Sequence, residues 1–83
     1  LGCAQYLMHR TGHNIGHRCH GIGANLDDYE THDDRCLLPG TMFSIEPGLY
    51  TDKYGVRLEY DVHITSEGET KVYGPVQDEI LVI

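Results

Sequence analysis

The sequence predicts an α+β fold that consists mostly of antiparallel strands with one short helical stub. Short runs rich in β-branched and aromatic residues, which suit a half-buried pleated surface, fill the second half of the chain. Turn residues bound each of these runs, and glycine interrupts the first half too often for a long helix. A length of 83 residues fits one small domain or a piece of a larger one.

The composition excludes several classes of partner and location for this protein. The 13 acidic residues outnumber the 6 basic ones, and a net charge of −7 argues against nucleic acid or an anionic membrane as a partner. No apolar run is long enough to span a bilayer. Three cysteines, an odd number, do not make a disulfide framework and favour a reducing, cytoplasmic location. Because the chain opens on Leu1 rather than on an initiator Met, we expect an N-terminal part to be missing.

The first half is expected to be irregular after its start. Residues 1–8 contain good helix formers and predict the tail of a helix. Four glycines from Gly12 to Gly23 exclude a stable helix there, so we expect a short extended piece with tight turns. Residues 24–38 are polar and acidic and predict a surface loop with at most a helical turn.

The second half contains the predicted strands. Residues 41–49 alternate loosely and are broken by Pro47-Gly48, whereas residues 56–65 alternate strictly. One face of the latter run is apolar, and the other carries Arg57, Glu59, Asp61 and His63. Residues 70–73 follow a turn and should pair with this strand as a hairpin, and residues 77–83 are expected to form a last strand.

Two glutamates on neighbouring predicted strands need an explanation. Glu46 lies between Ile45 and Pro47, and Glu59 follows a turn on the next strand. Across an antiparallel pair the two carboxylates could face each other, and like charges in that position repel. A buried carboxylate is costly unless it is paired or binds a metal, so this pair calls for a cation between its members.

Histidines supply further ligands for such a cation, because four of the six lie between His9 and His20. Imidazole together with carboxylate suits divalent zinc, manganese, iron or cobalt. Two other interpretations stay open. One is a nucleophilic cysteine, Cys19 or Cys36, beside a histidine. The other is a small structural zinc site, although its residues lack a paired CxxC motif: Cys19, His20, His32 and Cys36.

Four motifs follow one another along the chain: His9-Arg-Thr-Gly-His13-Asn-Ile-Gly, His20-Gly, Ser44-Ile-Glu46-Pro-Gly-Leu-Tyr50 and Gly55-Val-Arg57-Leu-Glu59. This order resembles the C-terminal half of the pita-bread metallopeptidases of family M24, and within them the Xaa-Pro aminopeptidase and prolidase branch. The resemblance implies that residues 1–83 are the C-terminal portion of a single catalytic domain, with a curved, mostly antiparallel sheet. The implied activity is hydrolysis of the bond before proline by water activated on two divalent metals.

The resemblance also implies roles for individual residues. His13, Glu46 and Glu59 match metal ligands, and Glu46 also matches the general base or proton shuttle. His9 and His20 match histidines that bind substrate and stabilise the transition state. Arg57 matches an arginine beside the glutamate that bridges the two metals. His17 matches no functional position, and Asn14 stands where glycine is commoner in the family.

The family site also uses two aspartates that precede its histidine, and this chain has no aspartate before Asp27. We therefore expect an incomplete metal site and an inactive chain when these residues stand alone. In the complete enzyme two ions of manganese, cobalt, zinc or iron are expected. The expected partners are a peptide with proline at its second position, the remainder of the catalytic domain and, as an open alternative, a second copy in a homodimer. A catalytically inactive binding module on the same fold is the competing interpretation.

Overall fold

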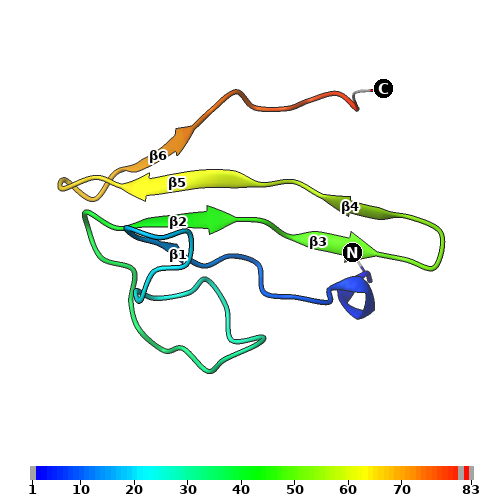
Figure 1. Cartoon of the computed structure of the whole chain (residues 1–83), viewed down its shortest axis with the longest axis horizontal. Coiled ribbons are helices and arrows are strands. Elements are labelled where there is room, and N and C mark those ends of the chain that lie inside the picture. Colours follow the sequence, from blue (N-terminus) through cyan, green and yellow to red (C-terminus); the bar gives the residue numbers. More distant parts are fainter. Residues whose placement is uncertain (1, 81, 83) are drawn as a thin grey trace.

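A computed structural model describes residues 2–80 and residue 82. The elements run in the order η1, β1 to β6 (Figure 1). The single helical element is the 3₁₀ turn η1, Ala4–Tyr6. The strands are β1 (Asn14–Ile15), β2 (Met42–Ile45), β3 (Gly48–Tyr50), β4 (Gly55–Arg57), β5 (Tyr60–Ile64) and β6 (Thr70–Tyr73).

One long antiparallel hairpin dominates the molecule (Figure 1). Its outgoing arm is β2 followed by β3, and its returning arm is β4 followed by β5. The pair Ile45↔Tyr60 closes one ladder and the pair Gly48↔Arg57 opens the next. Counting along both arms from either pair places Glu46 opposite Glu59, so the register continues unbroken through the gap. The hairpin therefore presents the two glutamates side by side, as the sequence predicts.

β1 and β6 flank the β2–β5 end of the hairpin, on the left in Figure 1, and make a four-stranded sheet of order β1-β2-β5-β6. All of its pairings are antiparallel. Its centre is the cross-strand pair Phe43↔Val62, whose side chains are the buried hydrophobic residues of the described chain. The core is small, as expected for a chain of this length.

The first half of the chain is largely irregular, as predicted. The expected helix tail over residues 1–8 is only the 3₁₀ turn η1, because a segment this short cannot stabilise a regular helix. The glycine-rich stretch forms the short strand β1 and a loop, and residues 24–38 form the lower loop in Figure 1. No helix in the described part of the chain is long and apolar enough to cross a membrane.

The second half differs from the predictions at two places. The run 56–65 is not one strand, because its ladder is interrupted at Leu58-Glu59, opposite the break at Glu46-Pro47. Proline cannot donate a ladder hydrogen bond, so a break on one arm breaks both. The last predicted strand is wrong for residues 77–80, which form no strand; residues 81 and 83 lie outside the described residues. The hairpin of β5 with residues 70–73 is confirmed.

Candidate metal centre

The candidate site lies on one face of the sheet, where two rows of cross-strand neighbours adjoin. The carbonyl of His13 accepts a hydrogen bond from the N–H of Ser44 (2.9 Å), and Ser44 pairs with Asp61. In the next row, the N–H of Glu46 bonds to the carbonyl of Thr11 (2.6 Å), with Glu59 opposite. Because side chains two residues apart on a strand share a face, Ser44 and Glu46 point the same way.

His13 and Glu46 are in direct contact. Their side chains are mostly buried, 8% and 14% exposed, and His13 Nε2 lies 3.1 Å from Glu46 Oε1. The other ring nitrogen of His13, Nδ1, donates to the carbonyl of Asn14 (3.1 Å), because that oxygen can only accept. This bond fixes the orientation of the ring and leaves Nε2 as the atom that faces Glu46.

Ser44 connects these two residues. It is only 1% exposed, and its Oγ accepts a hydrogen bond from the N–H of His13 (3.1 Å). The same hydroxyl donates to Glu46 Oε1 (3.0 Å). A single serine therefore ties the backbone of one site residue to the side chain of the other. Sequence reasoning missed this role; the only signal was a serine two residues before Glu46, which shares its strand face.

Arg57 lies between the two glutamates. Its guanidinium is 3.8 Å from Glu46 Oε2 and 3.5 Å from Glu59 Oε2. The opposed carboxylates were predicted to need a cation, and in this structure the guanidinium provides one. Glu59 and Arg57 are about half exposed, so solvent screens this part of the site more than the contact of Glu46 with His13.

His9 forms a second pair at β3. Its Nδ1 donates to the carbonyl of Arg10 (2.8 Å), so its Nε2 accepts a hydrogen bond from the hydroxyl of Tyr50 (2.8 Å). The two rings are tilted, with centroids 5.4 Å apart. Both lie against Gly48, which is opposite Arg57 in the sheet. Tyr50 was another omission of the sequence analysis, although it closes the motif that contains Glu46.

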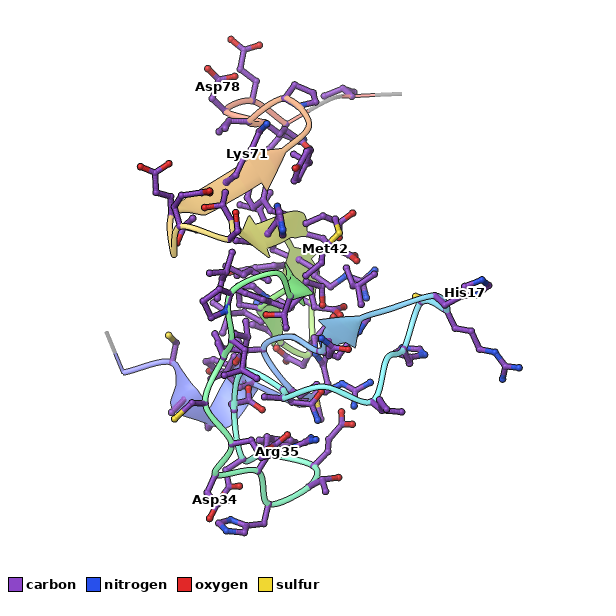
Figure 2. The ribbon with its side chains drawn as sticks, turned by 90° about the vertical axis from the view of Figure 1, so that its left-hand side faces the viewer. His17, Asp34, Arg35, Met42, Lys71 and Asp78 are labelled. Carbon is purple, nitrogen blue, oxygen red and sulfur yellow. The ribbon has the colours of Figure 1, made fainter. Side chains whose placement is uncertain are left out.

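His20 reaches the site from the loop after β1. Its ring centroid is 4.3 Å from that of His13. His17, on the same loop, projects away from the sheet in Figure 2. Within the described residues, one group of three His, Cys, Asp or Glu side chains has all its ligand atoms within 4.8 Å: His13, Cys19 and His20. His32 lies elsewhere, bonded to Asp28 (3.0 Å), so the four residues of the structural zinc alternative are not brought together.

A carboxylate also anchors the segment that leads into the site. Asp27 accepts a hydrogen bond from the N–H of Thr11, in the row of Glu46, and another from the N–H of Tyr29 (3.2 Å). Partial burial raises the pKa of Asp27, but the hydrogen bonds from Thr11 outweigh this effect, and the pKa lies below its ordinary value. The ionised carboxylate thus holds residues 11–13 against the loop.

The donor set fits a divalent metal at His13 and Glu46. Two ligands at about 2.1 Å from one ion lie roughly 3 Å apart, which is the separation of these two atoms. The lone pair on His13 Nε2 faces a carboxylate oxygen, and a shared cation relieves this opposition. Glu59 lies opposite Glu46 in the hairpin. Among the described residues, however, the ligand atoms of His13, Glu46 and Glu59 do not all lie within 4.8 Å of one another.

Comparison with known proteins identifies the family of this chain. The model of metallopeptidase family M24 matches residues 1–66. The chain belongs to this family. A probable dipeptidase, PepE, of Mycobacterium bovis is 40% identical over 73 residues, which cover 86% of this chain and 18% of that protein.

Solved M24 structures share the fold. Dipeptidase PepE from Mycobacterium ulcerans superposes with a TM-score of 0.75 at 32% identity, covering 96% of this chain and 20% of that one. The Xaa-Pro dipeptidase from Bacillus anthracis superposes with a TM-score of 0.74 at 34% identity, covering 99% of this chain and 22% of that one. The predicted pita-bread fold is thus confirmed. The chain spans about a fifth of the length of the relatives that it matches.

Proposed function

We propose that this chain is the C-terminal part of a single catalytic domain whose complete form is a metal-dependent peptidase. Its substrate would be a peptide with proline at the second position, cleaved at the Xaa-Pro bond by an aminopeptidase or dipeptidase. The observation that supports the proposal is the contact of His13 with Glu46, together with the register that sets Glu59 opposite Glu46 in the hairpin. Family membership adds weight, and the similar Bacillus anthracis protein is named an Xaa-Pro dipeptidase.

His13, Glu46 and Glu59 would hold two divalent ions, with manganese, cobalt, zinc and iron as the candidates. When bound, such ions supply Lewis acidity and an activated water. Aspartates from the remainder of the domain would complete the ligand set, because this chain has none before Asp27. The 83 residues alone are therefore expected to be inactive.

The chain's own residues have distinct tasks in this proposal. Glu46 is positioned by Ser44 and His13, so it can take a proton from the attacking water and give it to the leaving amine. His20, beside His13, would stabilise the oxyanion that develops on the scissile carbonyl. His9, oriented by Tyr50, would bind substrate. Arg57 would position Glu46 and Glu59 through its two ion pairs.

The deciding experiment uses the protein extended upstream through the missing part of the domain. We expect two metals per chain by elemental analysis and cleavage of an Xaa-Pro peptide. Absence of both would favour the inactive binding module on the same fold. Cleavage of peptides without preference for proline would support the peptidase activity but refute the proposed substrate class.

The three cysteines are free, which fits a cytoplasmic enzyme.

Glu59→Gln in that extended protein tests the ligand assignment. Replacing a ligand with an amide should reduce activity at least about 100-fold, since even residues that only orient ligands cost 10–100-fold. Metal content should fall with activity. Glu67→Gln, in the exposed turn between β5 and β6, is the matched control and should leave both unchanged. Normal turnover of Glu59→Gln would remove this residue from the metal centre.

A further inference from the structure

The cluster of His13, Cys19 and His20 is a second possible ligand set that the proposed peptidase does not use as a unit. Its three ligand atoms lie within 4.8 Å of one another. His13 is buried at the sheet, whereas Cys19 and His20 are exposed on the loop above it. The thiol is thus open to solvent and next to two imidazoles.

The loop that carries Cys19 and His20 is fastened at both ends. The N–H of Gly16 donates to the carbonyl of Arg18 (3.1 Å), which closes the turn before Cys19. After His20, the N–H of Gly21 donates to the carbonyl of Asn14 (2.8 Å). These bonds place the two side chains beside His13.

The side chain of Asn14 fixes the same loop to the sheet. Its Oδ1 accepts from the N–H of Gly23 (3.0 Å), and its Nδ2 donates to the carbonyl of Met42 on β2 (3.1 Å). A Cβ at Gly21 or Gly23 would lie only 2.0 or 2.5 Å from this side chain, so glycine is needed at both positions. The backbone of the loop that carries Cys19 and His20 is therefore fixed beside His13 before any ion binds.

The ligand types select the ion. A thiolate with two imidazoles suits zinc and other thiophilic divalent cations, whereas magnesium and manganese prefer carboxylate and water oxygens. Zinc is four-coordinate in such surroundings, so three protein ligands leave one position for water. We propose that His13, Cys19 and His20 form a binding site for a thiophilic divalent cation such as Zn²⁺. Binding releases the thiol proton to solvent.

The site has a consequence that rests on the proposed peptidase function. His13 is also a proposed ligand of the peptidase metals, and His20 is a proposed substrate-binding residue. An ion bound by Cys19, His13 and His20 would leave His13 unable to bind the peptidase metals and His20 unable to bind substrate. Excess zinc would then inhibit the complete enzyme, and Cys19→Ser would relieve the inhibition.

Cobalt binding to this chain under reducing conditions tests the site without any activity measurement. Co²⁺ is the probe, because a thiolate ligand gives it a near-ultraviolet charge-transfer absorption. We expect this absorption in the wild-type chain and its disappearance on addition of Zn²⁺. Cys19→Ser should abolish it, whereas Cys36→Ser, which alters another exposed cysteine, should retain it. Wild-type chain without the absorption, or equal loss in both variants, would overturn the proposal.

The imidazole ligands are tested by affinity. His20→Ala should weaken Co²⁺ binding by about tenfold or more, as expected for loss of a ligand. His17→Ala is the matched control, because this exposed histidine lies on the same loop but outside the cluster. An equal effect of both variants would show that the loop binds metal without the proposed geometry. Neither result depends on Xaa-Pro cleavage, so the two proposals fail separately.

Discussion

At the residue scale, the sequence predicted the pairing of the two glutamates better than it predicted the bonds that hold the surrounding side chains. Glu46 and Glu59 were expected to face each other because cross-strand register is readable from the sequence, whereas His13 was expected beside them only through the family resemblance. Ser44 and Tyr50 were not expected, because a serine or tyrosine on a strand is unremarkable until its partner is known. Their partners come from segments far away in the chain: His13 for Ser44 and His9 for Tyr50.

Ser44→Ala tests the connection between His13 and Glu46. The change leaves a buried N–H of His13 without its acceptor and removes a donor to Glu46. We expect the free energy of unfolding to fall by about 1–3 kcal/mol, the cost of a buried unsatisfied group. Denaturant unfolding of this chain measures it. Ser66→Ala is the control, because it loses only an exposed hydrogen bond to Glu67 and should change the unfolding free energy little. Equal losses of unfolding free energy in the two variants would refute the buried connection.

His20→Ala distinguishes a substrate-binding histidine from a metal ligand of the peptidase centre. In the extended protein, turnover of an Xaa-Pro peptide should fall by roughly 100-fold, the usual worth of one transition-state donor. The content of manganese, which does not suit the thiolate site proposed above, should stay unchanged. His17→Ala should affect neither. If His20→Ala loses metal in parallel with activity, His20 is a ligand and its proposed role is wrong.

At the element scale, the loop of residues 24–38 is ordered by a small network rather than by secondary structure. Arg35 donates to the carbonyls of Ile22 (2.8 Å) and Gly23 (3.0 Å) and pairs with Asp33 (2.8 Å). Asp33 also accepts from the N–H of Asn25 (2.9 Å). Figure 2 shows Arg35 at the end of the molecule formed by this loop. The network joins the loop to the segment that follows Cys19 and His20.

Asp33→Asn should destabilise the chain in a pH-dependent way. Hydrogen bonds from Arg35 and Asn25 hold the pKa of Asp33 well below its ordinary value. Because the folded pKa is depressed, this carboxylate stabilises the fold above the unfolded pKa of about 3.9 and loses that effect as pH falls through the folded value. The difference in unfolding free energy between wild type and Asp33→Asn should thus be constant near neutrality and shrink below about pH 4.

Denaturant unfolding at a series of pH values measures this difference. Asp52→Asn, in the turn between β3 and β4, controls for the general loss of a negative charge. The network would be contradicted if the loss of unfolding free energy in Asp33→Asn became larger as the pH falls. It would also be contradicted if that loss equalled the loss in Asp52→Asn at every pH.

The strand predictions failed where pairing between strands, which alternation alone does not reveal, decides the structure. Alternation in residues 56–65 predicted one continuous strand, but pairing with Pro47 interrupts it. The apolar residues after position 77 predicted a strand, yet residues 77–80 have none, because a pattern of β-formers does not supply a partner. The turn before β6 was predictable, since its residues are local and suffice to set it.

At the scale of the whole molecule, the chain is more open than a compact domain of the same length. Its radius of gyration is 14.2 Å, against about 12 Å expected for a compact domain of this length. Its accessible surface is 6690 Å², roughly a third more than a folded protein of this mass exposes. The predicted apolar face is fully buried only at Val62 and half-buried at Tyr60 and Ile64. Val56 and Leu58 are 56% and 44% exposed. We propose that the upstream part of the catalytic domain, as proposed above, covers this face.

The exposed strands should make the chain self-associate when it is alone. β6 is an edge strand of the described sheet, and all four of its residues are exposed. An edge strand presents unpaired N–H and C=O groups to other chains, and Val72 and Tyr73 add apolar surface beside them. Sedimentation velocity over a range of concentrations should therefore show dimers or larger species.

Val72→Lys should shift this equilibrium toward the monomer, because a charge on an edge strand opposes pairing with a second chain. Val76→Lys adds the same charge at an exposed position outside the strands and should have a smaller effect. A chain that stays monomeric at every concentration would mean that its open surfaces do not pair. Equal effects of the two variants would assign the association to net charge rather than to the β6 edge.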